Sequence, residues 1–227
     1  MSSEFWAAIA GAIVGALAGG GITAILQWQT IKHETRQRNR GLAYSLLFKV
    51  RQIYRHLRGL NLHFEEALKG ASAQQMALPW AILQGMTGSP ADVFFSVEEI
   101  ALVLELKATK TLDALLSMDE KHNATFGTFR FYGEKRDQLV DALTPDFMDG
   151  DHGLADVPLP LRPKSIGLAG IVHDMREYLS SDTGHALDVL QQLAELFEGR
   201  LEVEFSAMPK PEPAPADKLP IEGPRVR

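Results

Sequence analysis

The 227-residue sequence predicts an all-α protein with a single N-terminal transmembrane helix, a long basic heptad helix and a cytoplasmic helical bundle. Three observations predict this class. Residues 5–28 carry no charge, apolar residues recur at heptad spacing from Leu46 to Phe64, and the remaining apolar residues mostly follow helical periodicity. The expected segments are a short extracytoplasmic N-terminus (1–4), the transmembrane helix (5–28), a basic juxtamembrane helix (29–69), an acidic helical domain (70–205) and a disordered proline-rich tail (206–227).

The uncharged segment is long enough to cross a bilayer. Its 24 residues make a helix of about 36 Å, against a hydrocarbon core of about 30 Å. Aromatic residues stand at both ends, with Phe5 and Trp6 before the segment and Trp28 closing it. A buried core helix or a secretory signal peptide is the alternative, but a signal peptide begins with basic residues and this chain begins Met-Ser-Ser-Glu.

Basic residues follow the span and set its expected orientation. The first ones are Lys32, Arg36, Arg38 and Arg40, whereas only Glu4 precedes the span. Because positive residues stay on the cytoplasmic side, we expect the N-terminus outside the cell membrane and the C-terminal domain in the cytoplasm. At that position the four side chains would contact anionic lipid headgroups.

Glycine recurs every four residues within the span, at Gly11, Gly15 and Gly19. This spacing places the three on one helix face, where a second helix can approach closely. The pattern favours a homo-oligomer through the span, or packing on a partner's span. The alternative is that glycine and alanine are simply common in membrane helices.

A heptad stripe follows the span. Its members are Leu46, Val50, Ile53, Leu57, Leu60 and Phe64. Residues 30–69 are also basic, with nine Lys or Arg against three Asp or Glu, whereas the chain beyond them holds 14 against 25. Additional apolar residues widen the stripe, which favours packing inside an intramolecular bundle over a two-stranded coiled coil. The opposite charges suggest that the basic helix and the acidic domain pack together.

Helices are expected through the acidic domain as well. Ser96 and Glu99 form a capping box, in which the Ser hydroxyl and the Glu carboxylate each bind the other residue's amide. Apolar spacing, together with glycine and proline positions, places a linker at 70–75, a loop at 146–162 and helices at 79–84, 97–118, 124–143, 166–179 and 184–201.

Catalytic signatures are missing from the sequence. Without cysteine there is no disulfide, no Cys-bound zinc and no cysteine nucleophile, and we expect no cofactor. The weak metal candidates are the loop residues Asp149 and Asp151, which fail the EF-hand pattern, and the pair His173 and Glu177, which share a helix face. A surface ion pair is the alternative reading of the second pair.

Two further histidines, His56 and His63, flank the heptad stripe. They either respond to pH or lie at the rim of the core.

The expected function is that of a non-enzymatic, membrane-anchored interaction, scaffold or regulatory protein. Its cytoplasmic bundle would bind another protein, and no nucleic acid is expected because the net charge is −6. One alternative is a membrane effector that oligomerises into a pore or lesion under the control of the cytoplasmic domain. A second alternative is a membrane-tethered hydrolase that uses the acidic loop.

Overall fold

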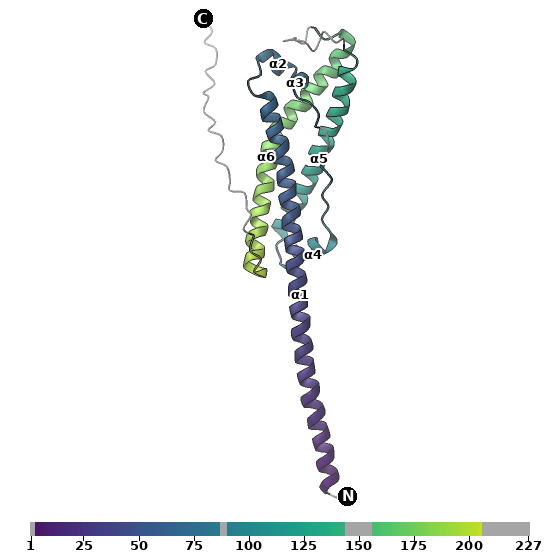
Figure 1. Ribbon diagram of the computed structural model, residues 1–227, viewed down its shortest axis with the longest axis vertical. Helices are drawn as coiled ribbons and strands as arrows, with labels where there is room; N and C mark the ends of the chain where they lie inside the picture. The colour runs from purple at the N-terminus through teal and green to yellow at the C-terminus, as the bar shows by residue number, and fades with distance from the viewer. Residues whose placement is uncertain (1–2, 87–89, 144–155, 206–227) are drawn as a thin grey trace.

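The computed structural model describes residues 3–86, 90–143 and 156–205, with side chains from residue 26 onward. These residues form helices and no strand, so the all-α, bundle-like architecture is confirmed. Figure 1 shows the long helices lying side by side, with the N-terminal part of the first projecting beyond the others. In chain order the elements are α1 (Ser3–Leu68), α2 (Ala73–Ala77), α3 (Pro79–Ile82), α4 (Val97–Glu105), α5 (Thr109–Val140), the 3₁₀ turn η3 (Leu159–Leu161) and α6 (Arg162–Leu201).

The α1 helix runs without a break from the predicted span into the heptad stripe. Across the part of the chain that the structure describes, none of the helices combines the length and the apolar character needed to cross a membrane. The predicted span over residues 5–28, with Gly11, Gly15 and Gly19, falls almost entirely where side chains lie outside the described residues. The acidic loop with Asp149 and Asp151 and the tail 206–227 also lie outside them.

Two short helices follow α1. The predicted linker over residues 70–75 is partly wrong, because Ser72 caps α2 by accepting from the Gln75 amide while the Gln75 side chain accepts from the Ser72 amide. Pro79 lies in the first turn of α3. Amides of the first turn have no acceptor within the helix, so the missing N–H of proline costs the helix no hydrogen bond. The α3 residue Trp80 is buried and donates its indole N–H to Ser165 of α6 at 3.0 Å, which fixes α3 on the bundle.

The predicted helix over residues 97–118 is interrupted. It starts as expected, with the capping box of Ser96 and Glu99 present, but α4 ends at Glu105. Lys107 adopts a left-handed conformation with φ 57°, and the amide of Ala108 bonds back to the Val103 carbonyl. This is the hydrogen-bonding pattern of a Schellman motif at a helix end. Its left-handed position, occupied here by Lys107, is usually a glycine. The chain then turns into α5.

The predicted start of α5 and the predicted break within α6 are also wrong. The α5 helix starts at Thr109 rather than at residue 124, and α6 joins the two helices expected at 166–179 and 184–201. Gly184 is accommodated within α6, since glycine costs a helix only about 1 kcal/mol relative to alanine. Pro163 lies in the first turn of α6, where proline begins a helix instead of extending the predicted loop.

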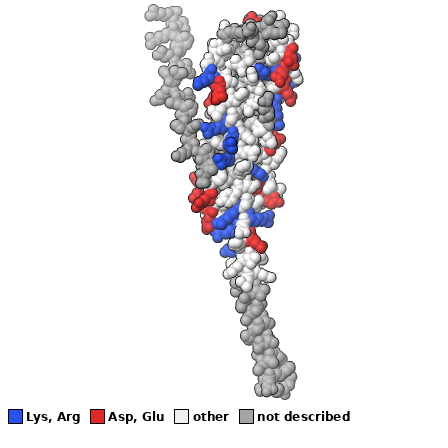
Figure 2. All heavy atoms as spheres, viewed as in Figure 1, with Lys and Arg blue, Asp and Glu red and all other residues white. Residues whose placement is uncertain are grey.

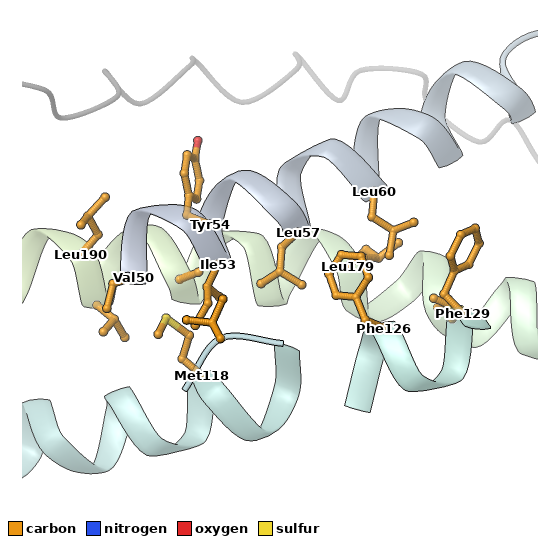
Figure 3. Close-up of a cluster of buried hydrophobic side chains, with 14 of the residues drawn as sticks. Val50, Ile53, Tyr54, Leu57, Leu60, Met118, Phe126, Phe129, Leu179 and Leu190 are labelled. Carbon is orange, nitrogen blue, oxygen red and sulfur yellow. The ribbon is translucent and has the colours of Figure 1, made fainter. Parts of the chain in front are cut away.

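The heptad stripe forms the centre of the core. All six of its members are at most 1% exposed, and α1 packs chiefly against α6 and also against α4. Figure 3 shows stripe residues of α1 lying among Met118 and Phe126 of α5 and Leu179 and Leu190 of α6. The heptad stripe is therefore buried inside the chain's own helical bundle. Nothing in the described residues supports a coiled coil.

Candidate membrane-facing site

The α1 helix leaves the bundle as a projecting rod. Every side chain from residue 26 to residue 38 is exposed, and the first buried residue of α1 is Ala43. Figure 2 shows Lys and Arg side chains gathered where α1 emerges from the bundle. We call residues 26–40 the projecting segment. The bundle covers almost none of this segment, yet it belongs to the same continuous helix as the part of α1 inside the bundle.

Three large apolar side chains are exposed at the start of this segment, just before its first cation, Lys32. Leu26, Trp28 and Ile31 are each 57–63% exposed, which is unusual for large apolar residues on one short stretch. The Lys32 ammonium lies 5.1 Å from the centre of the Trp28 ring, a cation–π contact. An indole beside a lysine suits the interface between hydrocarbon and water, where tryptophan is enriched.

The end of the segment is tied to the C-terminal end of α6. Arg40 donates from Nε to the Leu201 carbonyl at 2.7 Å, and both Arg36 and Arg40 form ion pairs with Glu202. Glu202 has φ 56°, so the chain turns away from α6 there and its carboxylate meets α1. Figure 1 places this end of α6 beside the point where α1 projects.

These contacts divide the four residues predicted to touch lipid headgroups. Arg36 and Arg40 are engaged with the bundle, whereas Lys32 and Arg38 form no ion pair among the described residues. Both ion pairs are solvent-exposed contacts that join α1 to the end of α6 where α1 leaves the bundle. Lys32 contacts the Trp28 ring, and Arg38 interacts electrostatically with Glu98 of α4.

A second ion pair joins α1 to the acidic domain deeper in the fold. The Glu99 side chain is 2% exposed and accepts hydrogen bonds from Lys49 Nζ at 2.7 Å, from the Ser45 hydroxyl at 2.6 Å and from the Ser96 amide at 2.7 Å. Burial raises the pKa of the Glu99 carboxyl, but these hydrogen bonds lower it further than burial raises it. The expected packing of basic helix on acidic domain occurs here and at Glu202.

A pair of histidines lies between α1 and α5. His56 Nδ1 and His122 Nε2 are 3.2 Å apart, and the two rings stack with centroids 5.5 Å apart. His122 is 1% exposed, and its other nitrogen lies 3.2 Å from the Asn123 side-chain oxygen, while Asn123 in turn donates to Asp119. The contact between the two imidazoles requires one of the facing nitrogens to be unprotonated.

Acidification should therefore destabilise the bundle. Burial lowers the pKa of both histidines, and His122 and Arg55 lower that of His56 further, while Asn123, Asp119 and Asp92 partly oppose the shift at His122. In the folded protein the pKa values of the two histidines lie below the unfolded value of about 6.5. The neutral pair therefore contributes its full stabilisation of the fold above pH 6.5, and this stabilisation is lost as the pH falls from 6.5 towards the folded pKa values.

We expect the melting temperature to fall between pH 7.5 and pH 5.5, and His122→Leu to remove part of that fall. His173→Leu, at an exposed site on α6, is the matched control and should leave the pH dependence intact. Thermal melts followed by circular dichroism at several pH values measure the effect. An equal fall in the wild type and in His122→Leu would contradict the role of the pair.

The other predicted polar residues lie apart from these clusters. His63 contacts the Gln84 carbonyl at 2.9 Å and the edge of Phe129, as expected for a residue at the rim of the core. His173 and Glu177 are both exposed on α6. No group of three or more potential metal ligands occurs among the residues that the structure describes.

The sequence did not predict three contacts of α1. They are made by Glu202, by His122 and by the Glu99 carboxylate. Each contacts a residue of α1 that is 50 or more positions away in the chain. Only Glu99 carried a local signal, its place in the capping box. Comparison of the chain with protein-family models, with curated proteins and with solved structures found no match.

Proposed function

We propose that the protein is a non-enzymatic membrane anchor that displays its helical bundle at the cytoplasmic face of the cell membrane. The observation that carries this proposal is the continuity of α1, which is one helix from Ser3 to Leu68. The C-terminal third of α1 contributes residues to the core of the bundle. Residues 5–28 of the same helix carry no charge. A helix of this composition that projects from a folded domain needs an apolar environment, and a bilayer provides one.

The charged residues support one orientation. Trp28 would stand at the interface, with Lys32 and Arg38 within about 15 Å of it along the helix axis, at the level of the headgroups. The bundle begins immediately beyond, because Arg36 and Arg40 bind the end of α6. The bundle would therefore be held close to the lipid surface, which suits a protein that presents a binding surface to a cytoplasmic partner.

Charged substitutions in the span should release the protein from membranes. We expect Val14→Arg combined with Leu17→Arg to shift the full chain from the membrane pellet to the supernatant after alkaline carbonate extraction, because each arginine costs about 2.5–3.5 kcal/mol at the centre of a span. Phe48→Arg combined with Leu62→Arg adds the same charges on exposed α1 positions and should leave the protein in the pellet. Release of the wild type by carbonate would contradict the anchor.

Association of the spans is a further part of the proposal. A glycine repeat at residues 11, 15 and 19 allows two spans to pack closely, so we expect Gly15→Ile to lower dimerisation in a membrane two-hybrid assay by at least fivefold. Val14→Ile, beside it, is the control and should retain the signal. An unchanged signal in Gly15→Ile would mean that the glycines do not drive association.

A further inference from the structure

We propose that one outer face of α1 binds an acidic amphipathic helix of a partner protein. We call this face the aromatic–arginine stripe, and it consists of Tyr44, Phe48, Arg51, Gln52 and Arg55. The proposal rests on the proposed function, since it names the partner chemistry and the binding surface of the displayed bundle. The observations behind it are the exposure of the aromatic residues, the absence of ion pairs to the arginines from the residues that the structure describes, and the geometry of the stripe.

The stripe lies on the side of α1 that faces away from the core. Its members recur at spacings of three and four residues, which places them on one helix face, opposite the buried heptad stripe. Phe48 is 66% exposed and Tyr44 is 48% exposed. Single exposed apolar residues are ordinary, but two aromatic rings one turn apart beside two arginines have the composition of an interface centre.

The arginines of the stripe are not compensated by the acidic domain. Arg51 and Arg55 form no ion pair or hydrogen bond among the described residues. By contrast, Arg36, Arg40 and Lys49 on the same helix each bind a carboxylate. Within the part of α1 that packs in the bundle, Lys49 is thus paired with a carboxylate, whereas Arg51 and Arg55 are not paired with any described carboxylate.

The spacing indicates what kind of anion fits. Residues four apart on a helix have their Cβ atoms about 6 Å apart, so Arg51 and Arg55 match carboxylates that are also four apart on a facing helix. Guanidinium groups pair with carboxylates through two parallel hydrogen bonds. Phe48 and Tyr44 continue the stripe by two further turns and would pack on apolar residues of the same partner helix, and the whole stripe is about 16 Å long.

Two other occupants fit less well. Arg51 lies 23 positions beyond Trp28, or about 35 Å along the helix, which exceeds the Debye length of about 8 Å severalfold, so lipid headgroups at the Trp28 level do not reach it. A second copy anchored in the same membrane would run parallel and would set its own arginines against these two. Like charges at that position oppose self-association through the stripe.

The test uses the full chain in a non-ionic detergent, which keeps it dispersed whether or not it inserts into membranes, and a fluorescein-labelled, 18-residue amphipathic helix of glutamate and leucine. Fluorescence anisotropy should show binding that weakens with salt, and Arg51→Gln combined with Arg55→Gln should raise the dissociation constant at least tenfold. Phe48→Ala should raise it severalfold. The control removes two other exposed cations by Lys110→Gln and Arg176→Gln and should bind as the wild type does. A lysine–leucine helix should not bind.

Several outcomes would overturn the proposal. They are an absence of peptide binding, equal losses in the stripe and control variants, and stripe-dependent binding of anionic vesicles or single-stranded RNA in place of the peptide. Self-association that the stripe variants abolish would overturn it as well. Membrane insertion is scored separately by carbonate extraction. A chain that is extracted by carbonate but binds the peptide refutes only the anchor, and an integral chain that does not bind refutes only the stripe.

Discussion

Phe64→Ala is expected to lower the free energy of unfolding by about 3–5 kcal/mol. Phe64 belongs to the heptad stripe, is 1% exposed and lies against Phe129 of α5 with ring centroids 5.8 Å apart. Its truncation removes buried apolar surface and leaves a cavity between α1 and α5 that neighbouring helices fill only in part. Chemical denaturation followed by circular dichroism measures the change.

The matched control is Phe48→Ala, which makes the same substitution on the same helix at an exposed position. We expect it to change the free energy of unfolding by at most about 0.5 kcal/mol. If the heptad stripe instead served an intermolecular coiled coil, the effect of Phe64→Ala would depend strongly on protein concentration. Such a dependence would contradict the intramolecular bundle.

Glu99→Ala is the second substitution with a large expected effect, a loss of about 3–5 kcal/mol. The change leaves the Lys49 ammonium without its carboxylate, removes the acceptor of the Ser45 hydroxyl and opens the capping box at the start of α4. The loss should be smaller at pH values low enough to protonate the carboxyl, because its lowered folded pKa stabilises the fold only above that range.

Glu98→Ala is the control for this substitution, because it removes an exposed carboxylate one position earlier in the same helix. Its effect on the free energy of unfolding should be far smaller than that of Glu99→Ala, because solvent screens an exposed carboxylate. A double-mutant cycle with Lys49→Ala should show coupling of at least about 1 kcal/mol between the two residues. Strict additivity would show that Glu99 and Lys49 do not interact in solution.

Sequence periodicity predicted the core of this protein well. The heptad stripe is buried because six apolar residues at alternating spacings of three and four can share one side of a helix. The capping box at Ser96 was equally predictable, since both of its hydrogen bonds are made within four residues. Features of this kind depend only on neighbours in the chain.

Helix boundaries were predicted less well, for a physical reason. The break after α4 uses Lys107 in a left-handed conformation, and nothing in the type of that residue indicates it. Conversely, Gly184 was taken as a boundary, although tertiary packing carries α6 through it. Packing over a 40-residue helix exceeds the small local penalty of one glycine.

The candidate site depended on contacts that sequence could not supply. Arg36 and Arg40 were predicted as lipid ligands because of their position after the span. In the structure both form ion pairs with Glu202, which is more than 160 residues away and meets them because α6 runs back along α1. The same holds for His122, which reaches His56 across the interface between α1 and α5.

The most direct test of the account is the topology of the full chain in cells. A fluorescent protein that folds only in the cytoplasm and a phosphatase that is active only outside it are fused in turn after Arg227. The account predicts fluorescence with the first fusion, no phosphatase activity with the second, and retention of both in the membrane fraction after carbonate extraction. Phosphatase activity without fluorescence, or fluorescence from protein released by carbonate, would contradict a cytoplasmic bundle held by an N-terminal span.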